Sequence, residues 1–302
     1  MKNQKDHRSP DHSSEFERPF HIEAPQKITQ PFVFNSPHSG RIYPENFVNS
    51  SRLDALTLRK SEDAYVEELF ADVPKLGAPL LYAHFPRAYL DVNREPYELD
   101  PELFTGALPE YANTKSIRVI GGLGTIARVV TESEEIYNRP ISIDDALKRI
   151  KQLYMPYHTK LQNLLNECQA RFGFSILIDC HSMPSIPGSF NHERPDFVLG
   201  DRFGKSCDKR LTNLIHEALT EMGYVVAMNK PYAGGYITEN YGKPHKNSHA
   251  LQIEINRSLY MNENTFEKND DFQTIRNILN VLVQRVFDDY EYSFSPVTAA
   301  AE

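Results

Sequence analysis

Two histidines occupy positions where metal-binding or catalytic groups are expected. His38 follows the apolar run Pro31–Phe34, and His181 follows the apolar run 174–178. The carboxyl ends of parallel strands meet at one edge of a sheet, where ligands collect. Two such histidines and one carboxylate would form a three-ligand zinc site with an open position, the arrangement of catalytic zinc. Asp179 would then fix the ring of His181. The alternatives are hydrogen-bonded loop histidines and a turn aspartate.

A glutamate within another predicted strand is the candidate general base. Residues 251–257 alternate strictly between apolar and polar side chains, which places Glu254 on one face with Gln252 and Asn256. A carboxylate flanked by isoleucines is costly to bury without a partner. Glu254 is therefore expected either to act as a base or to form a structural ion pair with an arginine.

The carboxylate that would complete a metal site is expected near the start of a predicted helix. Val66, Leu69 and Phe70 define the buried stripe of this helix, and Glu62 and Asp63 fall on the two edges of that stripe. The geometry allows either carboxylate to point inward and does not choose between them. A solvated acidic helix start is the third interpretation.

Positively charged side chains follow another predicted strand. Arg87 and the pair Asn93-Arg94 lie just after it. A guanidinium binds a carboxylate through two parallel hydrogen bonds, and an adjacent amide completes the clamp. These residues favour an anionic small-molecule substrate, whereas the competing interpretation is a structural pairing with Asp91 or Glu95.

A glycine-containing loop after a later strand is the last candidate for substrate contact. It spans residues 231–236 and includes Tyr232 and Gly234. Its glycines suit a loop that closes over a substrate, and its tyrosines offer hydroxyl donors. A plain turn explains the same residues equally well.

Two further motifs are set aside. Residues 122–127 match the dinucleotide-binding fingerprint, but the β-branched run Thr125–Val130 predicts a hairpin strand and not a helix start. Cys180 neighbours His181 in a predicted strand, so the two side chains point to opposite faces. Cys180 is therefore expected to be buried and inert.

The elements that must position these residues alternate along the chain. Strands that alternate with amphipathic helices predict a single α/β domain, a mostly parallel mixed sheet covered by helices on both faces. The strand candidates are Pro31–Phe34, Pro79–Phe85, Ser116–Gly121, Phe174–Asp179, Tyr224–Met228 and Ala250–Asn256. The helix candidates are Ser51–Leu76 with a break near Lys60, Ile143–Arg171 with a kink at Pro156, Lys205–Met222 and Asp271–Tyr290.

Composition excludes several classes of protein. The chain has 302 residues and a net charge of −8, which disfavours nucleic acid and anionic membranes as partners. Its three cysteines form no C-x-x-C pair, and the amino terminus lacks the apolar segment of a signal peptide. No apolar run is long enough to span a bilayer. We expect a cytoplasmic protein, with a homo-oligomer left open.

The domain boundaries follow from the same patterns. Residues 1–28 are expected to form a disordered polar tail, because the first 17 hold little apolar surface to bury. Residues 29–292 are expected to form the metallohydrolase domain, and residues 293–302 a short carboxyl-terminal tail.

Taken in order, these motifs resemble the N-formylglutamate amidohydrolase family, over roughly residues 30–260. The family is related in fold to the zinc carboxypeptidases and aspartoacylases, whose Asn-Arg pair binds a substrate carboxylate. The resemblance therefore implies a zinc carboxypeptidase-like fold. The segments that carry it are Asn35–Gly40, Ser61–Asp63, Asp91–Arg94, Asp179–Met183, Lys230–Gly235 and Glu254–Arg257.

The resemblance also implies a set of metal ligands. His38 and His181 are carried over as ligands of one zinc ion, with Asp63 as the third. Carboxypeptidases place their first histidine and glutamate three residues apart, but position 41 of this chain is an arginine. The carboxylate must therefore come from elsewhere, and the choice of Asp63 over Glu62 rests on the family pattern.

The implied reaction is hydrolysis of the amide bond of an N-acyl amino acid. Glu254 carries over as the catalytic carboxylate, and Arg87, Asn93 and Arg94 carry over as substrate-binding residues. The first expectation is N-formyl-L-glutamate, cleaved to formate and glutamate as in histidine catabolism. The alternatives are a deacylase or carboxypeptidase-like hydrolase of another N-acyl amino acid, or a non-catalytic protein that binds small carboxylates.

Overall fold

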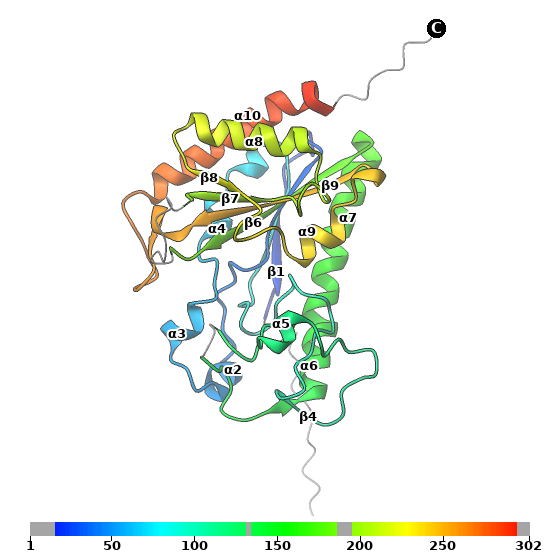
Figure 1. Ribbon diagram of the computed structural model, residues 1–302, viewed down its shortest axis with the longest axis vertical. Coiled ribbons are helices and arrows are strands. Elements are labelled where there is room, and N and C mark those ends of the chain that lie inside the picture. Colours follow the sequence, from blue (N-terminus) through cyan, green and yellow to red (C-terminus); the bar gives the residue numbers. More distant parts are fainter. Residues whose placement is uncertain (1–15, 131–133, 186–194, 295–302) are drawn as a thin grey trace, which may run out of the picture.

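A seven-stranded sheet organises the part of the chain that the computed structural model describes, which is residues 16–130, 134–185 and 195–294 (Figure 1). Its strand order is β1-β3-β2-β6-β9-β7-β8. Neighbouring strands are parallel except at two pairs, β1 with β3 and β7 with β9. The strands are β1 (Phe20–Glu23), β2 (Phe32–Ser36), β3 (Leu80–Ala83), β6 (Ser175–Met183), β7 (Phe197–Gly200), β8 (Val226–Met228) and β9 (Ser248–Asn256).

Helices cover both faces of this sheet. On one face the core contains α6 and α7, and on the other it contains α4, α8 and α10. Alternate residues of each central strand enter the two layers, as Leu177 and Ile178 of β6 do. The predicted α/β class, with a mostly parallel sheet covered on both faces, is confirmed. The α-helices are α2 (Glu45–Ser50), α3 (Ala55–Arg59), α4 (Val66–Leu69), α5 (Ile117–Ile120), α6 (Ile143–Arg149), α7 (Met155–Phe172), α8 (Lys209–Glu221), α9 (Tyr236–Tyr241) and α10 (Phe272–Phe294).

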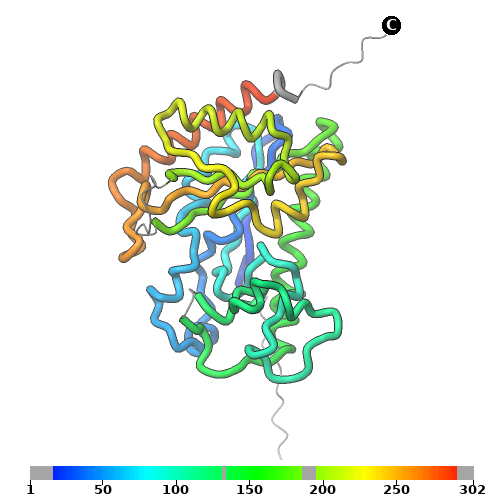
Figure 2. The backbone as a smooth tube through the Cα atoms, viewed as in Figure 1, coloured from blue at the N-terminus to red at the C-terminus, as the bar shows by residue number. Residues whose placement is uncertain are grey.

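Several short elements complete the fold. They are the 3-10 helices η1 (Val73–Leu76), η3 (Pro244–Lys246) and η4 (Arg257–Leu259), the π-helical turn η2 (Ile150–Tyr154), and the short strands β4 (Phe104–Thr105), β5 (Ile141–Ser142), β10 (Met261–Asn262) and β11 (Glu267–Lys268). The backbone trace in Figure 2 shows the segments around α2, α3, α5 and α6 gathered at one end of the molecule, beyond the sheet. The predicted helix Ile143–Arg171 consists of α6, the π-helical turn and α7 in succession, and Pro156 lies in the first turn of α7.

The predicted strand Ser116–Gly121 is wrong. This segment forms the short helix α5, because the Ser116 side chain accepts a hydrogen bond from the Val119 backbone N–H and caps the helix. Ile117 and Ile120 are exposed, so the apolar run does not mark a buried strand. The expected hairpin strand Thr125–Val130 is also wrong, since its only ladder contact in the described chain is an isolated bridge at Val129.

The predicted long helix Ser51–Leu76 is three short helices, α3, α4 and η1. The expected break near Lys60 is present, but it extends through Asp63 to Tyr65, which has a left-handed backbone with φ of 65°. Residues 60–65 therefore form an irregular connection, and the acidic residues within it do not start a helix.

The expected amino-terminal tail 1–28 includes part of the domain. Phe16 is buried in the core, and β1 pairs with β3 at the edge of the sheet. Residues 1–15 and 295–302 lie outside the described residues. Helix α10 ends at Phe294, so residues 293 and 294 belong to a helix and not to the expected carboxyl-terminal tail.

Cys168, Cys180 and Cys207 are buried free thiols, so Cys180 is buried as expected. Among the described residues, no helix combines the length and the apolar character needed to cross a membrane.

A close backbone approach at Gly40 fixes the loop that follows β2. A Cβ at this position would lie 2.1 Å from the Phe85 carbonyl oxygen, and that atom cannot move without shifting the segment after β3. We expect Gly40→Ala to lower the free energy of unfolding by about 1–3 kcal/mol, the usual range for overpacking. Gly121→Ala is the matched control, because its Cβ would meet its nearest neighbour at 3.5 Å. Denaturant titration measures both variants, and equal stabilities would contradict the prediction.

Candidate metal centre and active site

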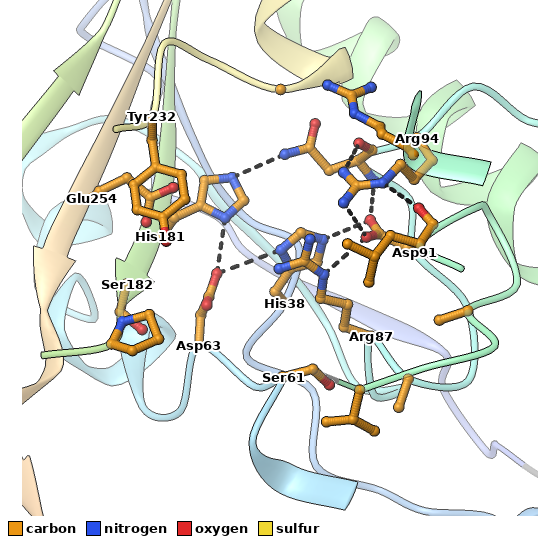
Figure 3. A pocket seen from close by; sticks show the side chains of 18 of the residues that line it. His38, Ser61, Asp63, Arg87, Asp91, Arg94, His181, Ser182, Tyr232 and Glu254 are labelled. Atoms are coloured by element: carbon orange, nitrogen blue, oxygen red, sulfur yellow. Dashed lines mark hydrogen bonds and ion pairs between the residues drawn. The ribbon is translucent and has the colours of Figure 1, made fainter. Parts of the chain in front are cut away.

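The candidate site is a pocket of about 480 Å³ at the carboxyl ends of β2, β6 and β9 (Figure 3). One wall comes from the sheet and includes His181 and Glu254. The opposite wall comes from the segment after β3 and includes Arg87 and Arg94. The carboxyl edge of a parallel sheet is the place where the sequence predicts the chemistry.

The structure brings His38, Asp63 and His181 together in this pocket. The Asp63 backbone N–H donates to the His38 carbonyl at 3.0 Å, which holds the irregular segment before α4 against the loop after β2. Asp63 Oδ2 lies 2.8 Å from His181 Nδ1 and 3.4 Å from His38 Nδ1. The three residues are buried, and each offers one ligand atom within 4.8 Å of the others.

Two further carboxylates hold the outer sides of the histidine rings. His38 Nε2 lies 2.8 Å from Asp91 Oδ1, and His181 Nε2 lies 3.0 Å from Asp179 Oδ2. Both Nδ1 atoms therefore face Asp63. Such an outer carboxylate is the usual partner of a metal-binding histidine. Asp179 has the position that sequence reasoning considered for it. The contact of Asp91 with His38 was missed, because Asp91 was weighed only as a partner for an arginine.

The donor set fits a divalent cation. His38 Nδ1 is buried and has no hydrogen-bond partner among the described residues, although it faces a carboxylate and a second imidazole. Burial alone would lower the pKa of His181, but the Asp179 and Asp63 carboxylates raise that pKa well above its ordinary value. The pocket therefore favours positive charge between its ligands. Two imidazoles and one carboxylate are a donor set that suits zinc.

The contacts of Asp63 and Glu62 show which of the two carboxylates faces the histidines. Glu62 is buried away from the histidines and accepts hydrogen bonds from the Tyr43 hydroxyl at 2.6 Å and the Arg59 guanidinium at 3.1 Å. Burial would raise the pKa of Asp63, but the hydrogen bond from His181 and the charge of the nearby His38 ring hold that pKa well below its usual range. Of the two candidates, Asp63 is the carboxylate that faces the histidines.

Arg257 contacts the same aspartate from behind, a contact that sequence reasoning missed. Its Nη2 donates to Asp63 Oδ1 at 3.0 Å, its Nε to Ser182 Oγ at 3.1 Å and its Nη1 to the Lys60 carbonyl at 3.0 Å. The Asp63 oxygen that faces away from the histidines is therefore occupied. Arg257 ends the motif that carries the family resemblance, but its partner lies 194 residues away in the sequence.

Glu254 lies beside the metal-ligand candidates, in register with His181 across β6 and β9. Gln252 Nε2 donates to Glu254 Oε1 at 2.7 Å. Burial raises the pKa of Glu254 to about 7, because the ionised form loses hydration, and the charge of Asp63 adds to this effect. Within the described chain no arginine or lysine forms an ion pair with it. Its surroundings fit a base, and the alternative of a structural ion pair is not observed.

Both predicted arginines line the pocket, and both are partly engaged by protein groups. Arg87 Nε donates to Asp91 Oδ2 at 2.9 Å. Arg94 donates from Nε to the Leu123 carbonyl and from Nη1 to the Asn93 carbonyl, each at 2.8 Å. The pairing of Arg87 with Asp91, which the sequence left open, is present.

The side chain of Asn93 has protein partners at both ends. Its Oδ1 accepts from the Ile237 backbone N–H at 2.8 Å, and its Nδ2 lies 3.3 Å from His181 Nε2. A Cβ at Gly235 would lie 2.4 Å from Asn93 Nδ2, so the loop before α9 packs directly on this amide. Asn93 also lines the pocket, and these contacts place its side chain between α9 and His181.

The loop after β8 forms the remaining wall of the pocket. Tyr232 and Gly234 both line it (Figure 3), and burial together with the charge of Glu254 raises the pKa of Tyr232. Gly234 has a left-handed backbone with φ of 114°, which a residue with a Cβ rarely adopts. The Gly235 N–H donates to Gln252 Oε1 at 2.8 Å, and Gln252 also contacts Glu254. The loop is thus linked to the candidate base.

The fold and site define an α/β protein with a buried candidate metal centre and an adjacent carboxylate at the carboxyl edge of its sheet. A family model described as N-formylglutamate amidohydrolase matches residues 30–261, and the chain belongs to this family. The resemblance inferred from the sequence motifs is confirmed.

Known relatives agree with this assignment. The chain is 29% identical to an N-formylglutamate deformylase of Pseudomonas putida, over 77% of this chain and 82% of the relative. It is 28% identical to an N-formylglutamate deformylase of Pseudomonas aeruginosa, over 77% and 83%. The crystal structure of N-formylglutamate amidohydrolase from Ralstonia eutropha superimposes with a TM-score of 0.85 at 35% identity, covering 91% of this chain and 99% of that one.

The two neighbouring carboxylates provide a matched test of the metal centre. We expect Asp63→Asn to weaken zinc binding by more than about 100-fold, beyond the usual loss from an outer contact, because the amide carries no charge toward the histidines. Glu62→Gln makes the same chemical change one residue earlier and is expected to keep metal affinity, although it loses the charge that pairs with Arg59. Competition with a chromophoric chelator measures both. Wild-type affinity in Asp63→Asn would refute the assignment.

Proposed function

We propose that this protein is a zinc-dependent amidohydrolase that cleaves N-formyl-L-glutamate to formate and L-glutamate. The observation that carries the proposal is the position of Glu254 beside the His38–Asp63–His181 cluster, in a pocket that also holds arginines. Membership of the N-formylglutamate amidohydrolase family supports the substrate. The products fit cytoplasmic histidine catabolism.

In this proposal His38, Asp63 and His181 hold one zinc ion. Such an ion supplies Lewis acidity toward water and toward the acyl carbonyl. Asp91 and Asp179 contact the Nε2 atoms of the two histidines, which leaves both Nδ1 atoms on the side of Asp63, where an ion would bind. Arg257 holds Asp63 from the opposite side through Oδ1. These contacts orient the three ligand side chains toward one another.

Glu254 moves the proton. It accepts a proton from the attacking water as the oxygen adds to the formyl carbon, and it returns this proton to the nitrogen as the C–N bond breaks. A pKa of about 7 suits both directions of transfer near neutral pH. Gln252 fixes one oxygen of the carboxylate and leaves the other for water.

The pocket recognises the anionic part of the substrate. Arg87 uses Nε to bind Asp91, and among the described residues its two Nη atoms have no hydrogen-bond acceptor, so they are donors for a carboxylate close to the reacting centre. Arg94 adds positive charge behind it. Tyr232, on the loop after β8, offers a hydroxyl donor to the substrate. A protein that only bound small carboxylates would need neither the ligand cluster nor a base beside it, so hydrolysis explains more of the pocket.

Metal removal tests the reaction class directly. We expect a strong chelator to abolish formate release from N-formyl-L-glutamate, and one equivalent of zinc to restore it. The control is protein dialysed in parallel without chelator. Undiminished turnover by protein shown to be free of metal would contradict the proposed mechanism.

Substitution of the proposed base separates proton transfer from metal binding. We expect Glu254→Gln to retain zinc but to lose about 10²–10⁴-fold in kcat, the usual contribution of a general base. Glu217→Gln, an exposed glutamate on α8, is the control and is expected to behave like wild type. Formate release measures turnover and elemental analysis measures zinc. Near wild-type turnover in Glu254→Gln would remove this residue from the mechanism.

A further inference from the structure

The pocket is lined by four arginines, and three of them have protein partners that limit what they can bind. Arg257 uses all three of its nitrogens on Asp63, Ser182 and the Lys60 carbonyl. This guanidinium holds the metal-ligand candidate, and each of its nitrogens already donates to a protein group. The four are Arg87, Arg94, Arg118 and Arg257.

Arg94 is similarly committed to the protein. Its Nε and Nη1 donate to backbone carbonyls, and its Nη2 lies 3.6 Å from Asp91 Oδ2. It is buried, and its bond to the Leu123 carbonyl ties the segment after α5 to the site. Arg94 thus contributes positive charge and holds neighbouring segments together, and it has few N–H donors left for a ligand.

Arg118 differs from the other three. Its guanidinium makes no hydrogen bond within the described part of the chain, and the nearest carboxylate oxygen, Glu98 Oε2, is 4.0 Å away. Its side chain is 35% exposed and borders the pocket. Sequence reasoning missed this residue, because the segment that contains it was expected to form a strand. It is a cation with open donors at the edge of the proposed active site.

Backbone hydrogen bonds connect the segment that contains Arg118 to its neighbours. The Leu123 N–H donates to the Arg118 carbonyl at 2.7 Å, and the Thr125 N–H donates to the Glu98 carbonyl at 2.8 Å. A Cβ at Gly124 would lie 2.3 Å from that same Glu98 carbonyl, so the chain passes too closely for any other residue. These contacts connect the segment that carries Arg118 to the Glu98 backbone beside the pocket.

The surroundings of Arg118 fit a short apolar chain that ends in a negative charge. The same segment lines the pocket with aliphatic side chains, those of Leu123, Ala127, Val129 and Val130. Burial lowers the pKa of Arg94 to about 10, and the positive charges of Arg87 and Arg118 add to this effect. The three guanidinium groups thus share one region of positive potential, which an anion would relieve.

Resting on the proposed function, we propose that Arg118 binds the side-chain carboxylate of a dicarboxylic N-acyl amino acid and determines specificity for it. A dicarboxylate brings two negative charges, and a guanidinium pairs with a carboxylate through two parallel hydrogen bonds. Arg87 shares Asp91 with His38, so it binds close to the scissile amide. Arg118 has no contact with the ligand cluster and binds the carboxylate farther away. The aliphatic residues around it cover the methylene groups between.

The test compares N-formyl-L-glutamate with N-formyl-L-glutamine, which has the same shape but no side-chain charge. Loss of a charged hydrogen bond is expected to reduce kcat/KM of Arg118→Met for the glutamate substrate by about 10- to 100-fold, mainly through KM. For the glutamine substrate we expect a change of less than about threefold. Arg118→Lys keeps the charge without the planar fork and is expected to be intermediate.

Controls separate this inference from the proposed function. Arg139→Met removes an exposed arginine outside the pocket and is expected to match wild type. An equal loss on both substrates, or no loss on the glutamate substrate, would overturn the role of Arg118. Failure of wild-type protein to hydrolyse either substrate would refute the proposed function instead. Calorimetric binding of the two compounds to wild type and Arg118→Met then decides the inference, and equal affinities would overturn it.

Discussion

The whole site depends on burying charged groups at one edge of the sheet, with Asp63 between two imidazoles. A buried carboxylate is unstable unless it is paired and hydrogen-bonded. Asp63 meets this requirement with His38 and His181 on one oxygen and Arg257 on the other. Each of these partner side chains also needs contacts that position it. The surrounding loops and strands must therefore fold so as to supply those contacts.

The sheet register carries much of that constraint. His181 lies opposite Glu254 across β6 and β9, and Asp179 lies opposite Asn35 across β6 and β2. Asn35 Nδ2 donates to Asp179 Oδ1 at 2.7 Å, and Tyr157 of α7 donates to Asn35 Oδ1 at 2.6 Å. A slip of one residue would turn these side chains into the apolar layers. The apolar core and the polar site therefore enforce the same alignment.

Sequence patterns predicted the parts of the site that regular strands position. Alternation placed Glu254 on its face, and strand ends located His38 and His181. The choice between Glu62 and Asp63 was beyond the residues alone, because the irregular backbone before α4 and contacts with distant side chains decide it. Ser116–Gly121 was misread for a related reason. Its apolar residues satisfy a strand pattern, but a serine cap starts a short exposed helix there.

The placement of charged residues around the pocket says more about the ligand than the net charge of the chain does. The net charge is −8, yet four arginines border one pocket of an acidic protein. Asp63 and Asp91 engage Arg257 and Arg87, and so pairing consumes part of this positive charge inside the protein. The capacity of the pocket to bind an anionic ligand depends on how many N–H donors are unoccupied, and not on the number of arginines. A residue outside every recognisable motif, Arg118, has the most open donors of the four, and local bonding explains why.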